Sequence, residues 1–97
     1  MRDDVRKLNE DARRLLAFMH AVYMRAGGGL ICVGPIEETF RETGLDQERY
    51  MAAANRLITK SLAEWFTMGG TVKFTDYGIQ VAEDDGMQDY ELPVEAV

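Results

Sequence analysis

Residues 46–75 constrain the fold of this chain more than any other segment, because a helical pattern runs directly into a strand pattern. Over residues 46–60 the apolar side chains recur at spacings of three and four, which predicts an amphipathic helix. Residues 64–68 and 71–75 read as two short strands on either side of Gly69-Gly70, a pair that suits the positive φ angles of a two-residue hairpin turn. The sequence therefore predicts a helix followed at once by a two-stranded antiparallel ribbon.

The predicted helix 46–60 divides into an apolar face and a polar face. The apolar face, expected to point into the core, comprises Tyr50, Met51, Ala54, Leu57 and Ile58 and continues to Leu62. The polar face, expected to point outward, comprises Arg49, Ala52, Ala53, Asn55, Arg56, Thr59 and Lys60. Asp46 is the predicted N-cap of this helix, since an aspartate side chain can accept a hydrogen bond from its first turn.

Two further helices are predicted before residue 46. Residues 4–26 have helical period, and Gly27-Gly28-Gly29 ends that helix by supplying a left-handed C-cap. The apolar run 30–33 predicts a short strand, in which Cys32 is expected to be buried and inert. A second helix opens with Pro35 in its first turn and ends at Gly44, and the candidates for its inward face are Ile36, Phe40 and Thr39.

A short last helix is predicted after the hairpin, followed by an acidic tail. Thr75 can cap a helix over residues 76–83, and beyond it the chain becomes polar with little periodicity. Residues 1–78 hold all 11 Lys and Arg and 11 of the 17 acids, so their formal charge is zero. The net charge of −6 comes from the 6 acids of residues 79–97, whereas the body is neutral and can still carry a basic face.

Length and composition favour one intracellular domain. Ninety-seven residues fit a single domain, and no apolar run approaches the roughly 20 residues that cross a bilayer, so no membrane partner is expected. The N-terminus has no apolar stretch of the signal-peptide kind, and a single cysteine cannot form an intramolecular disulfide, so a cytoplasmic location is expected.

Catalysis has little support in the sequence. His20 is the only histidine, and it has no neighbouring serine, cysteine or aspartate with which to form a nucleophilic set. One histidine and one cysteine cannot build a standard zinc site. We therefore expect no enzyme, no metal site and no cofactor.

In its order of elements the chain resembles a winged helix-turn-helix domain of bacterial and archaeal transcriptional regulators. The resemblance rests on residues 35–40 before Gly44-Leu45-Asp46, on residues 50–62 leading into Trp65, and on the string 74–83. That string is similar to the Leu-Thr-x-x-Gly ending of such domains, with Phe74 in place of leucine. It implies an α+β, mainly α fold over residues 1–84: a three-helix core, a short strand, a two-stranded β wing and a short C-terminal helix. Residues 85–97 would form a flexible tail.

One position departs from the family pattern. Many of these domains carry a glycine between the third helix and the wing, whereas this chain has Ser61 or Leu62 there. The third helix is therefore expected to run as much as one turn further than in the family.

The resemblance implies a DNA-binding regulator whose third helix enters the major groove while the wing lies on the adjacent backbone. Arginine and asparagine read bases through paired hydrogen bonds, and lysines contact phosphates. The candidate contacts to double-stranded DNA are Arg49, Ala52, Asn55, Arg56, Thr59, Lys60 and Lys73.

Three further hypotheses about partners stand beside this one. The length of the first helix, with Val5, Leu8 and Leu15, favours a homodimer through that helix. The neutral body, the acidic tail and the methionines instead favour a winged helix that binds a protein partner without binding DNA. In a third arrangement the acidic tail folds back over Arg49, Arg56 and Lys60 and competes with DNA.

Overall fold

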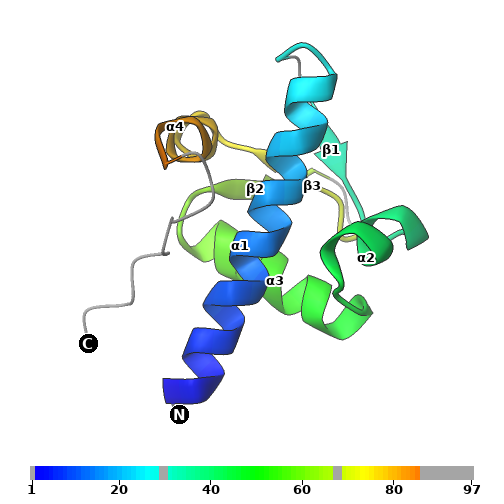
Figure 1. Cartoon of the computed structure of the whole chain (residues 1–97), viewed down its shortest axis with the longest axis vertical. Coiled ribbons are helices and arrows are strands. Elements are labelled where there is room, and N and C mark those ends of the chain that lie inside the picture. Colours follow the sequence, from blue (N-terminus) through cyan, green and yellow to red (C-terminus); the bar gives the residue numbers. More distant parts are fainter. Residues whose placement is uncertain (1, 29–30, 67–68, 86–97) are drawn as a thin grey trace.

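The computed structural model describes residues 2–28, 31–66 and 69–85, and it is α+β and mainly helical (Figure 1). The helices are α1 (Arg2–Arg25), α2 (Glu37–Thr43), α3 (Gln47–Thr59) and α4 (Asp76–Asp85). The strands are β1 (Cys32–Val33), β2 (Ala63–Trp65) and β3 (Val72–Phe74). In the view of Figure 1, α2 and α4 lie on opposite sides of α1, which crosses α3.

The three strands form one antiparallel sheet with β3 in the centre. Val33 and Trp65 both pair with Val72, so the strand that precedes α2 is joined to the hairpin that follows α3. Val33 and Val72 are buried on the inner face of this sheet. Cys32 pairs with Lys73 and is exposed, so the prediction of a buried thiol was wrong. Successive residues of a strand face opposite sides of the sheet, so Cys32 faces outward when its neighbour Val33 faces the core.

The core lies between α1, α3 and the inner face of the sheet. Its largest fully buried side chains are Tyr50, Leu15, Leu16, Met19, Leu45, Leu57, Leu62, Val72 and Thr39. The period-three-and-four stripe of α1 is therefore confirmed as a core-facing stripe over its middle turns. Full burial of Leu15 means that this side chain belongs to the core of one chain and cannot serve a dimer surface.

The second helix begins later than predicted. Ile36 is its N-cap residue with an extended backbone, so Pro35 lies before the helix and outside its first turn. Ile36 is 56% exposed, and the buried residues of α2 are Thr39 and Thr43. The prediction of an inward Ile36 was wrong, because a residue outside the helix does not share the periodic face.

The third helix has the predicted cap at its start and a different ending. The Asp46 carboxylate accepts a hydrogen bond from the Arg49 backbone N–H at 2.8 Å. At the other end Ser61 N–H donates to Ile58 O and Leu62 N–H donates to Leu57 O, which is the Schellman pattern. Ser61 has φ 64, so it occupies the left-handed position that glycine usually fills. The helix therefore ends at Thr59, and the predicted extension was wrong.

Thr75 and Gly78 join α4 to the turn that ends α3. Thr75 Oγ1 donates to Ser61 O at 2.6 Å and accepts from Gly78 N–H at 2.9 Å, which confirms the predicted cap. A Cβ atom on Gly78 would overlap the carbonyl oxygen of Leu62. The Thr-x-x-Gly string thus has a local physical reason: the threonine caps the helix, and the glycine permits its close approach to the backbone.

The hairpin has a longer connection than the predicted two-residue turn. With a turn of Gly69-Gly70 alone, Thr67 would face Val72, whereas Trp65 occupies that place. Phe66 N–H donates to Thr71 O at 2.8 Å and closes the described part of the ribbon. The predicted strand residues Thr67 and Met68, like Leu30 of the first strand and the tail over residues 86–97, lie outside the described residues.

Candidate interaction surface of α2 and α3

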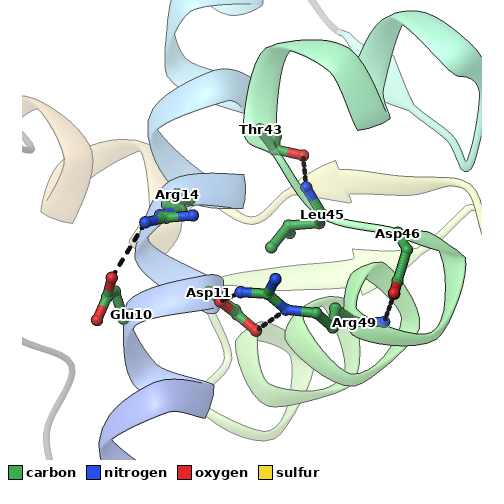
Figure 2. Close-up of polar contacts among 7 residues, drawn as sticks. All are labelled: Glu10, Asp11, Arg14, Thr43, Leu45, Asp46 and Arg49. Carbon is green, nitrogen blue, oxygen red and sulfur yellow. Dashed lines mark hydrogen bonds and ion pairs between the residues drawn. The ribbon is translucent and has the colours of Figure 1, made fainter.

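Arg49, the first candidate for base contact, is held against α1 (Figure 2). Its Nε donates to Asp11 Oδ2 at 3.0 Å and its Nη2 donates to Asp11 Oδ1 at 2.6 Å. The hydrogen bond and the charge of Asp11 raise the pKa of Arg49. The side chain of Asp11 is 7% exposed, so its charge depends on this partner. The Arg49 side chain thus links α3 to α1.

The pairing of Asp11 with Arg49 was not predicted from the sequence. The position of Asp11 offered a signal, because it lies three residues after Leu8 and four before Leu15, on the apolar stripe of α1. A carboxylate on a buried stripe requires a cation or several hydrogen-bond donors. Arg49, which pairs with this carboxylate, lies 38 residues away in sequence, so no local pattern connects the two residues.

Arg56 is also turned toward α1. Its Nε donates to Asn9 Oδ1 at 2.9 Å, and the residue is half-buried. Arg49 and Arg56 lie seven residues apart, two helical turns, so both come from the side of α3 that faces α1. The two arginines form polar contacts between α1 and α3 and do not belong to the exposed face of α3.

The exposed face of α3 carries one exposed charged side chain, Glu48. Ala52, Asn55 and Thr59 are exposed as predicted, and the Thr59 hydroxyl donates to the Asn55 carbonyl at 2.9 Å. Two assignments were wrong: Ala53 is fully buried, and Met51 is 37% exposed. Residues at the boundary of a helical stripe change sides with a small rotation of the helix, and the contact of α3 with α1 sets that rotation.

The lysines of the candidate DNA surface lie at its edges. Lys60 is half-buried at the C-cap of α3. Lys73 Nζ lies 3.3 Å from a Glu64 carboxylate oxygen and 5.7 Å from the centre of the Phe66 ring. Trp65 at the end of β2 and Phe66 directly after it are both exposed, so neither side chain belongs to the core.

Acidic side chains dominate what α2 and α3 expose. Among residues 36–60, all of which the structure describes, the exposed base is Arg41. The exposed acids of the same segment are Glu37, Glu38, Glu42, Asp46 and Glu48. The exposed side chains of this segment thus carry five negative charges against one positive charge, while the cations of Arg49, Arg56 and Lys60 are half-buried beside them, so this face lacks the positive potential that attracts a polyanion.

The Tyr50 side chain on the inner side of α3 contacts β1 and the hairpin turn. Its hydroxyl oxygen lies 2.6 Å from the Gly70 carbonyl oxygen and 3.2 Å from the Val33 carbonyl oxygen, to which it can donate its single proton. Burial raises the pKa of Tyr50 to about 12. The Phe40 ring packs edge-on against the Tyr50 ring, with 6.2 Å between their centres. The start of α3, the end of β1 and the hairpin turn thus meet at Tyr50.

Comparison of the chain with protein-family models, curated proteins and solved structures returns no match. Within the described residues, no helix is long and apolar enough to cross a membrane. The same part of the chain has no group of three or more metal-ligating side chains placed to hold an ion.

Proposed function

We propose that this chain is a winged helix-turn-helix domain that binds a protein partner through the exposed side of α2 and α3. The winged-helix assignment is supported by the order of the elements and by the central position of β3 between β1 and the first hairpin strand. The left-handed Ser61 at the end of α3 supports it too, because the residue takes the conformation of the glycine that the family places there.

The observation that carries protein binding is the charge of the α2 and α3 surface. Its exposed side chains are five acids, one base and several apolar or neutral groups. The arginines expected to contact DNA hydrogen-bond to Asp11 and Asn9 of α1. Affinity for DNA depends on the number of phosphates that cations neutralise, and this face offers few cations for that purpose.

DNA binding remains the second candidate because of one feature of α3. Ala52, Asn55 and Thr59 share one exposed stripe, which combines a small residue for close approach with two hydrogen-bonding side chains. If this stripe contacted bases, the cations that bind the DNA phosphates would have to come from outside α2 and α3. A homodimer would supply further cations, because it doubles the number of phosphate contacts.

A pair of matched variants distinguishes the two functions. Ala52→Glu adds a negative charge to the exposed face of α3, and Ala21→Glu adds the same charge to an exposed position of α1. We expect the wild-type chain to show no saturable binding to a labelled random-sequence DNA duplex at low salt, with a Kd weaker than about 10⁻⁴ M. Saturable DNA binding that Ala52→Glu abolishes and Ala21→Glu preserves would establish DNA binding through α3 instead.

A further inference from the structure

Three segments that are distant in sequence meet around Met51. A Cβ atom on Gly70 would lie 3.1 Å from Met51 Sδ and 3.4 Å from Pro35 Cγ. The hairpin turn, the loop before α2 and the first half of α3 therefore touch at this point. Ile36, next to Pro35, is 56% exposed, and Met51 is 37% exposed. We name the exposed side chains of Ile36 and Met51, together with the half-buried Pro35 and the buried Gly70 between them, the Met51 surface.

A buried tyrosine beneath the Met51 surface helps to fix its shape. The Tyr50 hydroxyl lies 2.6 Å from the Gly70 carbonyl oxygen, to which it can donate its single proton, and 3.2 Å from the Val33 carbonyl oxygen of β1, so the residue beside Met51 holds the hairpin turn against α3. A surface that is formed before binding loses little conformational freedom when a partner docks. The thioether of Met51 is also flexible and polarisable, and so it adapts to different apolar side chains.

Glutamates border the Met51 surface. Glu37 and Glu38 follow Ile36 at the start of α2, and Glu48 lies three residues before Met51, on the same side of α3. All three glutamates are exposed. The surface therefore has an apolar centre with exposed glutamates next to it on two of its three segments, and Arg41 lies one turn further along α2.

We propose that the Met51 surface binds a basic amphipathic segment of a partner protein. Apolar side chains of that segment would cover Ile36 and Met51, while its lysines or arginines would meet the bordering glutamates. The acidic tail of this chain does not fit, since residues 86–97 carry Asp89, Glu91 and Glu95 and no base. The inference rests on the proposed protein-binding function and adds the site and the chemistry of the partner.

Matched peptides test the chemistry of the partner. Three peptides of about 18 residues, five helical turns, would share leucines at one helical face and differ only in flanking lysine, glutamate or serine. Each would be titrated into the isotopically labelled full chain and followed by NMR. We expect the affinity of the lysine peptide to exceed that of the glutamate peptide by a factor of about ten or more. The shifted amides should cluster at Ile36, Glu48, Met51 and Gly70. Equal affinity of the three peptides, no binding by the lysine peptide, or shifts centred elsewhere would overturn the proposal.

Variants test the site itself. Ile36→Ser with Met51→Ser should weaken the lysine peptide about tenfold, since both apolar contacts are lost. Met24→Ser removes an exposed methionine near the end of α1, 59% exposed, and should change nothing. Glu37→Lys with Glu48→Lys alters exposed side chains alone, and this pair should make the glutamate peptide the tighter ligand. Retention of the original preference by that pair would contradict the role of the glutamates.

Other occupants give different results. If the full chain forms a dimer in sedimentation equilibrium and Met51→Ser dissociates it, the occupant is a second copy and the proposal fails. DNA binding abolished by Ala52→Glu would instead reject the proposed function from which the inference starts. Absence of both DNA binding and peptide binding at the Met51 surface would reject this inference while leaving other protein-binding faces open.

Discussion

Ser61 holds a backbone conformation that its side chain disfavours. Its φ of 64 lies in the left-handed region, and the two hydrogen bonds of the Schellman ending require that conformation. We expect Ser61→Gly to raise the free energy of unfolding by about 1 kcal/mol, because glycine adopts this conformation without a steric cost. For a domain of this size the melting temperature should rise by roughly 4–8 °C, as calorimetry can measure.

The control for Ser61→Gly is Ser61→Ala, which keeps the Cβ atom and should not stabilise the chain. Equal stabilisation by alanine and glycine would show that removal of the hydroxyl is responsible and that the backbone conformation is not. The prediction belongs to a single residue, because the Ser61 carbonyl that accepts from Thr75 is present in every variant.

Ionisation of Tyr50 should lower the stability of the fold at alkaline pH. Burial raises its pKa from 10.0 to about 12, so on raising the pH the unfolded chain loses this proton first. The stabilisation from Tyr50 is therefore complete below pH 10 and is lost between pH 10 and about 12. Tyr50→Phe should lower the free energy of unfolding by about 1–2 kcal/mol at neutral pH, because it removes a buried hydrogen bond. It should also give a shallower decline above pH 10, as urea unfolding at several pH values can measure.

Tyr77→Phe is the matched control, since Tyr77 is 51% exposed on α4. This variant should keep the wild-type dependence of stability on pH. If Tyr50→Phe and the wild type lose stability in parallel above pH 10, ionisation of a different group is responsible.

At the scale of elements, α1 and α3 are joined by the ion pair of Asp11 and Arg49. From the sequence alone, Arg49 was predicted to contact DNA. We expect Arg49→Ala to lower the melting temperature clearly, because it leaves the Asp11 carboxylate, 7% exposed, without its cation. Arg14→Ala removes the exposed i,i+4 pair with Glu10 and should change stability by no more than about 0.5 kcal/mol. Figure 2 shows both pairs: Glu10 and Arg14 both lie on α1, whereas Asp11 of α1 meets Arg49 of α3. Thermal unfolding of the two variants, measured side by side, tests the difference, and a similar loss from both would contradict it.

Local patterns predicted the elements well where one residue controls the backbone. Asp46 caps α3 and Thr75 caps α4, as their side-chain chemistry indicates. The start of α2 and the register of the hairpin were predicted wrongly, because Pro35 and the glycine pair permit more than one arrangement. Packing against neighbouring segments selects among such arrangements, and that packing is not encoded locally.

The candidate site was harder to predict for the same reason. Sequence spacing identified α3 and its exposed Ala52, Asn55 and Thr59 correctly. The roles of Arg49 and Arg56 depend on Asp11 and Asn9, which lie 38 and 47 residues away. Periodicity separates the faces of a helix, but it does not reveal which long side chains bend toward a neighbouring helix.

At the scale of the whole molecule, stability should be greatest where α1, α3 and the sheet meet. The fully buried side chains of the core come mainly from the middle of α1, from α3 and from Val72 of β3. α2 has seven residues and contributes mainly two buried threonines and the half-buried Phe40. Local opening needs less free energy in elements with little buried apolar surface.

Hydrogen exchange should therefore rank the elements. We expect the slowest amides in α1 around Leu16, in α3 around Leu57 and at Val72, all exchanging only by global unfolding. The amides of α2 should exchange faster, by local opening that leaves α1 and α3 packed. NMR-detected exchange with increasing urea separates the two routes, because global opening depends strongly on denaturant and local opening does not. Equal protection of α2 and α3 would mean that both helices open together as one cooperative unit.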